Sequence, residues 1–330
     1  MTVSFKLAHL PLWLVLLAGI AATSGCRVNA PGAGDTLSEP YATDRVPDAT
    51  DVPFGPAPLQ PQQLLDVYEA QGTSSGIAII FVHVGAWAAG DKSDAQTTPL
   101  LQYFMDQGHV VFSINYTLAE PFCLGPSPFP DNVNDVKWAI AWANMAAQKS
   151  TYNYDKVAVM GASAGGQLAL YAATTGNIRP LDMPQSHNPR PDAGLSFGAP
   201  SNMVTWGAQG TAAQQAAQQN VFGLNPVQCF WGQGFEHPDD VPLLARLIAT
   251  AAEFVDSGDP PIYMASSVDD ALALAEHNAD VLEQAYVDIG SGFGLAAWND
   301  RVPGTSHNMD YIANRAAVDL FLQLVADDVL

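Results

Sequence analysis

The sequence predicts an α/β fold in which one doubly wound, mostly parallel sheet carries helices on both faces. Apolar runs of strand length alternate with helical patterns from residue 51 onward, which is the order typical of strand–helix–strand units. The strand candidates are near-continuous apolar runs, as expected of strands covered on both faces. Hydrophobic residues make up 48% of the 330 residues, enough for a substantial core.

The first half of this region contains four strand candidates, and helical patterns follow the last three. The strands are expected at 64–70, 76–84, 109–116 and 157–160, and the helices at 99–107, at 131–148 and after the glycines that end at Gly166. Within 131–148, Val133, Val136, Ile140 and Ala143 share one helical stripe, so this helix has an apolar face that can pack on the sheet.

The second half continues the alternation with a longer interruption. Strands are expected at 193–200, 260–267 and 295–299, and helices at 281–287 and 316–325. Residues 201–258 contain two further helical stretches, 211–220 and 243–254. We expect residues 200–258 to be a cap-like insertion that supplies part of a pocket.

The N-terminus is typical of a targeting segment. Lys6 precedes an almost wholly apolar stretch, residues 7–22, and small residues lead to Cys26, so residues 1–25 are predicted to be a signal peptide. Residues 26–50 are rich in Pro, Gly, Asp and Thr and are predicted to be a tether. The catalytic domain is then expected to span 51–330.

Export has two possible forms in this sequence. "TSGC" resembles a bacterial lipobox, in which Cys26 would carry lipid and tether the protein to a membrane; ordinary periplasmic or secreted export is the alternative. Cys123 and Cys229 would remain, and in an oxidising compartment they could pair or stay as two free thiols.

Charge and motif content exclude several classes of partner. The chain has 12 basic and 33 acidic residues, a formal net charge of −21, so we expect no nucleic-acid partner. The sequence shows no metal-ligand spacing, no dinucleotide-binding glycine loop and no phosphate-binding lysine motif. We therefore expect no metal and no cofactor, and a small molecule as substrate. Nothing in the sequence indicates the oligomeric state.

A lone serine stands among glycines where the strand at 157–160 ends. Residues 161–165 read Gly-Ala-Ser-Ala-Gly, which matches G-x-S-x-G between a strand and a helix. In that context the small residues permit a sharp turn that exposes the Ser163 hydroxyl above the sheet. The following helix directs its N-terminal amides toward developing negative charge. Ser163 is therefore the candidate nucleophile, and a structural glycine turn is the alternative.

A serine nucleophile needs a base and a carboxylate that orients the base. His307 lies between the last short strand and the last helix, from where it could reach back over the strand ends. Two aspartates follow the strand at 260–267, and we choose Asp270 as the orienting acid, with Asp269 as the alternative. The order Ser163, Asp270, His307 is the chain order of serine hydrolases of the doubly wound type.

Backbone amides are needed to stabilise a tetrahedral intermediate. The loop after the strand at 76–84 can direct the amides of Gly85 and Ala86 at an oxyanion, and the amide of Ala164 is a third candidate donor. His83 is expected to organise this loop.

These segments resemble the α/β-hydrolase esterases of the bacterial feruloyl-esterase-domain and hormone-sensitive-lipase-like groups. "FVHVGAW" is similar to their H-G-G-x-W segment, "SINYTLAEP" to their N-Y-R-L-A-P stretch, and "GASAGGQLA" to their G-x-S-A-G-G-x-L-A motif. "SHNMDY" stands where their catalytic histidine stands, and the resemblance spans about residues 51–330. It implies the α/β-hydrolase fold, a Ser163–His307–Asp270 triad, hydrolysis of carboxylic esters and no cofactor.

The sequence departs from those groups at three places. Val84 replaces a glycine, Thr117 replaces an arginine, and Ser266–Ser267 replaces the common His-Gly before the acid. Because a β-branched residue resists positive φ, the backbone at Val84 is expected to stay extended.

The expected function is that of a serine esterase that forms an acyl-enzyme intermediate. An amidase of the aryl-formamidase type is the alternative enzyme, since both reactions use the same residues. A non-catalytic binding protein with the hydrolase fold is the alternative from another class.

Overall fold

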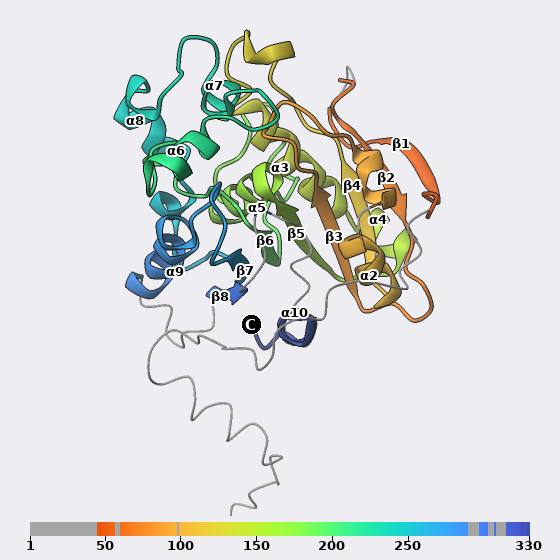
Figure 1. Cartoon of the computed structure of the whole chain (residues 1–330). Helices are drawn as coiled ribbons and strands as arrows, with labels where there is room; N and C mark the ends of the chain where they lie inside the picture. Colours follow the sequence, from red (N-terminus) through yellow and green to blue (C-terminus); the bar gives the residue numbers. More distant parts are fainter. Residues whose placement is uncertain (1–44, 57–59, 98, 290–296, 303–306, 308–314) are drawn as a thin grey trace, which may run out of the picture.

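The computed structural model describes residues 45–56, 60–97, 99–289, 297–302, 307 and 315–330. Within them the sheet has eight strands in the order β1-β2-β4-β3-β5-β6-β7-β8 (Figure 1). The strands are β1 (Ala49–Pro53), β2 (Leu64–Tyr68), β3 (Ile77–Val82), β4 (Val110–Ile114), β5 (Lys156–Ala162), β6 (Ala193–Phe197), β7 (Ile262–Ser267) and β8 (Ala297–Val302). The predicted α/β-hydrolase fold is confirmed.

The sheet is parallel except at one edge. From β4 to β8 neighbouring strands run parallel, whereas β2 runs antiparallel to both β1 and β4. β1 begins at Ala49, so the first strand includes the last two residues of the predicted tether. The N-terminal boundary of the folded region therefore lies before residue 51. The signal peptide and Cys26 lie outside the described residues.

The helices lie on both faces of the sheet (Figure 1). The α-helices are α2 (Pro99–Asp106), α3 (Asp131–Ala143), α4 (Ala146–Tyr152), α5 (Ser163–Thr174), α6 (Ala212–Gln218), α7 (Pro226–Trp231), α8 (Leu243–Ile248), α9 (Ala279–Asp288) and α10 (Arg315–Ala326). The 3₁₀ helices are η1 (Lys92–Thr97), η2 (Pro121–Cys123), η3 (Pro238–Asp240), η4 (Ala251–Phe254) and η5 (Ala275–His277). None of the helices in the described ranges is both long and apolar enough to cross a membrane.

Two cores form because successive side chains of each buried strand point to opposite faces. In β3, Ala78, Ile80 and Val82 pack with side chains of α3, α5 and α9. The alternate residues Ile77, Ile79 and Phe81 pack on the other face with side chains of α2 and α10. This double cover explains why the central strands are continuous apolar runs, and it fixes the carboxyl ends of the parallel strands at one edge.

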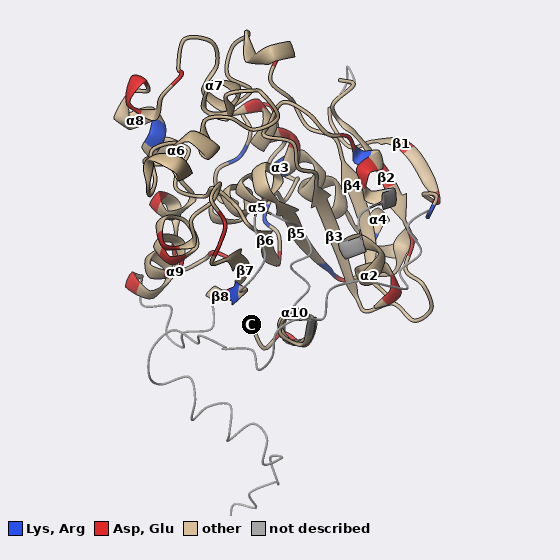
Figure 2. Ribbon diagram, viewed as in Figure 1, with Lys and Arg blue, Asp and Glu red and all other residues tan. Residues whose placement is uncertain are grey.

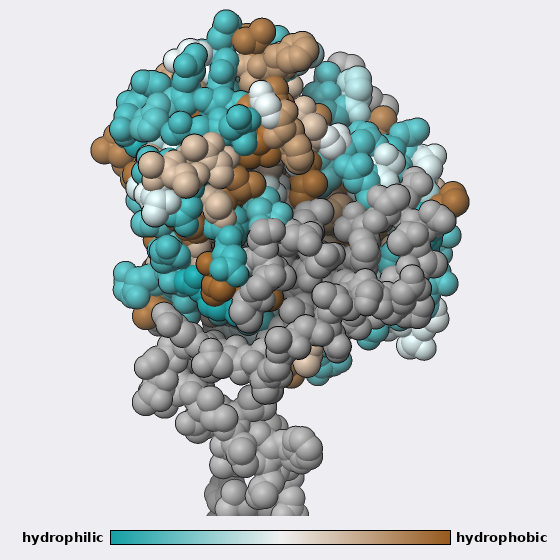
Figure 3. Space-filling view, in the orientation of Figure 1, coloured by the Kyte–Doolittle hydropathy of each residue, from teal (hydrophilic) through white to brown (hydrophobic). Residues whose placement is uncertain are grey.

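The surface of the described residues is mixed in character. Acidic positions scatter over helices and loops and are far more frequent than basic ones (Figure 2). Hydrophobic and hydrophilic side chains alternate on the face drawn in Figure 3. The large exposed apolar side chains include Phe122, Leu124 and Phe222.

Candidate active site

Ser163 lies at a sharp turn between the central strand β5 and helix α5, as the sequence predicts. Its φ of 51° is in the left-handed region, which costs a non-glycine residue about 1–2 kcal/mol. A Cβ on Gly161 would lie 2.4 Å from the Gly165 carbonyl carbon, and a Cβ on Gly165 would lie 2.1 Å from the Val82 carbonyl oxygen. The two glycines therefore allow α5 to approach β5 and β3 closely enough to support the strained serine.

The three predicted triad residues meet at this edge of the sheet. The Ser163 Oγ lies 2.8 Å from the His307 Nε2, and the His307 Nδ1 lies 2.9 Å from the Asp270 Oδ2. The Asp270 side chain is fully buried, whereas that of His307 is 22% exposed. A histidine with one nitrogen on a carboxylate and the other on a hydroxyl has the geometry of a general base.

Asp270, and not Asp269, is the carboxylate that contacts the imidazole. Its second oxygen, Oδ1, accepts N–H groups from Leu272 at 2.8 Å and from Ala273 at 3.0 Å. The serine pair that precedes the acid also shapes this turn, because the Ser267 Oγ accepts the Asp269 amide at 3.1 Å. Asp269 itself is exposed.

Two of the three predicted oxyanion donors lie beside the serine, one in the turn after β3 and one at the start of α5. Ala86 and Ala164 line the same pocket as Ser163, whereas Gly85 is not among the lining residues. Positive φ values occur at Gly85 (125°), Ala86 (52°) and Trp87 (60°). The φ of Val84 is not positive, in agreement with the expectation for a β-branched residue. The residues with positive φ in this loop therefore begin at Gly85, one residue after Val84.

His83 supports the turn that follows β3, and it does not contact Ser163. It is buried, its Nδ1 donates to the Val84 carbonyl at 2.8 Å, and its ring stacks on Tyr116 with centroids 4.3 Å apart. Burial lowers the pKa of His83, so the neutral imidazole is favoured. These contacts agree with its predicted role as a loop organiser.

Thr117, which stands in place of an arginine, contacts a buried carboxylate. Its amide and hydroxyl donate to the Asp135 Oδ2 at 2.8 and 2.6 Å, and Gln63 Nε2 donates to the other oxygen at 2.9 Å. Burial raises the pKa of Asp135 to about 6, although these hydrogen bonds lower it. Neutral donors therefore hold α3 to the loop after β4 without an ion pair.

A small apolar pocket opens beside Ser163. Its lining residues are Ala86, Trp87, Ser163, Ala164, Pro200, Trp206, Val221, Pro226, Leu272 and His307. Four of them, Pro200, Trp206, Val221 and Pro226, lie within residues 200–258. Apart from His307, none of these side chains is ionisable, so the pocket suits an uncharged group.

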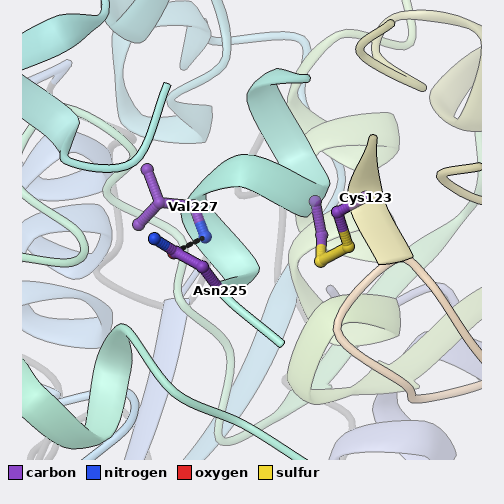
Figure 4. The surroundings of a disulfide bond; sticks show 4 residues. Cys123, Asn225 and Val227 are labelled. Atoms are coloured by element: carbon purple, nitrogen blue, oxygen red, sulfur yellow. Dashed lines mark hydrogen bonds between the residues drawn. A yellow bond between two sulfur atoms is a disulfide. The ribbon is translucent and has the colours of Figure 1, made fainter. Parts of the chain in front are cut away.

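The insertion is joined covalently to the loop that precedes α3. Cys123 in η2 and Cys229 in α7 form a disulfide, which settles the open question of their pairing (Figure 4). Helix α7 begins at the pocket residue Pro226, and the Asn225 side chain caps it by accepting the Val227 amide at 3.0 Å. The disulfide thus fixes the helix whose first residue lines the pocket.

Sequence reasoning did not identify Trp87 and Leu272 as pocket residues. Both stand next to predicted site residues, since Trp87 follows Ala86 and Leu272 lies two positions after Asp270. The signal in the sequence that could have identified them is an apolar residue close to a predicted catalytic residue.

The fold is that of an α/β-hydrolase, and the contacts of His307 join a serine hydroxyl, an imidazole and a carboxylate. The chain belongs to the BD-FAE family, whose model matches residues 65–284. The match includes Ser163 and Asp270 and ends before His307. Family and fold therefore agree with the resemblance seen in the sequence.

Curated relatives and solved structures extend this result. Esterase LipC of Mycobacterium tuberculosis is 37% identical over 119 residues, which are 36% of this chain and 28% of LipC. Esterase LipQ of the same organism is 32% identical over 131 residues, 39% of this chain and 29% of LipQ. The matched segments thus span less than a third of the length of these relatives.

The structural likenesses cover more of the chain at lower identity. A truncated carbohydrate esterase from gut microbiota aligns with a TM-score of 0.66 and 20% identity, over 87% of this chain and 98% of that one. Thermogutta terrifontis esterase 2 phosphonylated by sarin aligns with a TM-score of 0.55 and 17% identity, over 81% of this chain and 88% of that one. At these identities the likeness shows the fold alone.

Proposed function

We propose that the protein is a serine esterase that hydrolyses carboxylic esters of small molecules through an acyl-enzyme. The observation that carries the proposal is the pair of contacts at His307, 2.8 Å to the Ser163 Oγ and 2.9 Å to the Asp270 Oδ2. Membership of the BD-FAE family and the esterase names of the curated relatives support it.

The reaction follows from the contacts. His307 Nε2 takes the proton of Ser163 as Oγ attacks the ester carbonyl, and the amides of Ala86 and Ala164 donate to the oxyanion that forms. The tetrahedral intermediate then expels the alkoxide, which receives the proton from His307, and the acyl group stays on Oγ. Water attacks this acyl-enzyme with His307 again as base, releasing the carboxylic acid and restoring the serine. Asp270 keeps the imidazole in the required tautomer throughout.

Covalent labelling combined with turnover tests this proposal. Wild type is expected to hydrolyse p-nitrophenyl acetate and to react with a fluorophosphonate at Ser163, and Ser163→Ala is expected to lose the label and at least 10³-fold in kcat. Ser186→Ala is a matched control, because Ser186 is an exposed serine whose hydroxyl also lies near a histidine, 3.3 Å from the His187 Nδ1. Labelling at another residue, or full turnover by Ser163→Ala, would refute the mechanism.

The same assay separates the two alternative functions. Hydrolysis of aryl formamides in preference to esters would assign the protein to the amidases. Absence of both turnover and labelling in folded wild type would favour a binding protein.

We also propose that the protein is exported, either with lipid on Cys26 or in a soluble form. The Cys123–Cys229 disulfide supports export, because disulfides persist in oxidising compartments. Radiolabelled palmitate retained by wild type and lost in Cys26→Ala is expected for the lipidated form. Export without incorporation indicates simple secretion, and a protein that stays in the cytoplasm contradicts the proposal.

A further inference from the structure

Two buried tryptophans, Trp87 and Trp206, line the pocket beside Ser163. Trp87 is 1% exposed and Trp206 is 4% exposed, and their rings pack edge to face with centroids 5.1 Å apart. Trp87 comes from the turn after β3, and Trp206 comes from the insertion. This wall of the pocket is therefore made where two distant segments of the chain meet.

Both indoles are held by hydrogen bonds as well as by packing. The Trp87 Nε1 donates to the Gln167 Oε1 at 3.2 Å, and the Trp206 Nε1 donates to the Leu272 carbonyl at 2.8 Å. Phe230 packs on Trp87 with centroids 4.9 Å apart. Each ring is thus fixed by an N–H bond and by a neighbouring ring, so this wall of the pocket does not yield easily to a longer ligand.

The chemistry indicates which part of an ester faces this tryptophan wall. The alcohol must depart after the first step, and water must then reach the same side of the acyl-enzyme to be activated by His307. That side needs access to solvent, and the His307 side chain is 22% exposed. The acyl group stays on Ser163 through both steps, so it can lie against the wall formed by the buried tryptophans.

We propose that Trp206, backed by Trp87, limits the length of the acyl group, so that the substrates are esters of short-chain acids. This proposal rests on the esterase function proposed above and adds its acyl specificity. Adding a methylene that a pocket cannot accept changes kcat/KM by about 10- to 200-fold. Trp206 is therefore a specificity-determining residue supplied by the insertion.

An acyl-chain series tests the proposal. Wild type, Trp206→Leu and Trp206→Ala are assayed on p-nitrophenyl acetate, butyrate, hexanoate and octanoate, and folding is checked by circular dichroism. We expect the wild-type kcat/KM to fall steeply beyond butyrate. Trp206→Leu should raise the octanoate-to-acetate ratio of kcat/KM at least tenfold, and Trp206→Ala should raise it further.

Two matched variants isolate the cause. Trp206→Phe keeps an aromatic wall but loses the N–H to Leu272, so the wild-type length preference should persist. Trp142→Leu removes a tryptophan that is also buried and packed edge to face, on Phe112 in the sheet core, and it should keep the wild-type ratio. A ratio that rises equally in Trp142→Leu would mean general loosening and would overturn the proposal.

The remaining outcomes separate a failure of the acyl-length proposal from a failure of the proposed esterase function. A folded Trp206→Leu with an unchanged ratio, while Ser163 still labels and turns over acetate, overturns the acyl-length proposal and leaves the esterase intact. If kcat/KM instead varies with the alcohol in a series of acetate esters, the acyl-length proposal is overturned as well. Failure of wild type to label at Ser163 would instead remove the esterase function itself.

Discussion

Asp270 is held on both of its oxygens, and its role depends on that arrangement. One oxygen accepts two backbone amides of its own turn, at 2.8 and 3.0 Å, and the other contacts the His307 Nδ1 at 2.9 Å. The carboxylate is therefore oriented before any substrate binds. In the proposed mechanism it acts through the tautomer of the imidazole.

Replacing this carboxylate by its amide should stop the base without disturbing the fold. Asp270→Asn is expected to lower kcat by about 10⁴-fold, because an amide nitrogen facing Nδ1 favours the wrong tautomer of His307. Asp269→Asn is the matched control, since Asp269 is the exposed neighbour, and it should retain activity near that of wild type. Steady-state kinetics on p-nitrophenyl acetate measures both. A larger loss in Asp269→Asn would move the role to that residue.

The sequence was sufficient to predict the positions of site residues that come after the ends of strands. Ser163, Asp270 and His307 each come after a strand, and the carboxyl ends of parallel strands share one edge, so their meeting could be predicted. Trp206 could not be predicted in this way. It lies in irregular backbone between β6 and α6, and its partner Trp87 is remote in sequence, so only the tertiary fold joins them.

Among the elements, α3 carries an unusual buried cation. Lys137 is 3% exposed, and its ammonium donates to the carbonyls of Thr175 and Ile178 at 2.9 and 2.8 Å, just beyond the end of α5. These carbonyls lie in the turn that follows α5, where the Thr175 carbonyl also accepts the Ile178 amide at 2.8 Å. Lys137 thus stabilises the C-terminal end of the helix that begins at Ser163, at the expense of burying a charge.

The stability of the protein should therefore rise with pH above neutrality. Burial lowers the pKa of Lys137 from 10.5 to about 7, so between these values the unfolded chain binds more protons than the folded one. The free energy of unfolding should increase by up to about 2–3 kcal/mol between pH 7 and pH 9 because of this group. Urea denaturation at several pH values should show a flatter dependence in Lys137→Met.

Lys149 in the neighbouring helix α4 provides the control for this measurement. It is only partly buried, so Lys149→Met should keep the pH dependence of wild type. Equal slopes for wild type and Lys137→Met would contradict the assignment to Lys137.

Helical periodicity in the sequence did not predict every helix boundary. Residues 243–254 were predicted as one helix, but the structure has α8 at Leu243–Ile248 and a separate 3₁₀ helix at Ala251–Phe254. The Tyr171 hydroxyl donates to the Ile248 carbonyl at 2.5 Å, an acceptor that a continuous helix would have used. A tertiary contact ends the helix there. The segment contains no glycine or proline that would have predicted this helix end from the sequence.

On the scale of the whole molecule, the Cys123–Cys229 disulfide closes a long loop. The two cysteines are 106 residues apart, and the loop between them contains Ser163 and the four pocket residues from 200–258, Pro200, Trp206, Val221 and Pro226. A cross-link of this span limits the unfolded chain strongly, and removal of a native disulfide typically costs about 2–5 kcal/mol.

Cys123→Ala/Cys229→Ala should lower the free energy of unfolding by about that amount, as measured by urea denaturation. Wild type treated with dithiothreitol should shift in the same direction, whereas the double variant should not respond to the reductant. An unchanged denaturation midpoint in the double variant would show that the bond adds nothing to stability.

This cross-link has a practical consequence for producing the protein. The cytoplasm of common expression hosts keeps thiols reduced, so material made there would emerge with α7 no longer bonded to η2. Kinetic constants from such preparations would describe a looser pocket than the oxidised protein has. Expression in a periplasm or in a host engineered for oxidation, followed by a free-thiol assay, would supply the form suited to specificity measurements.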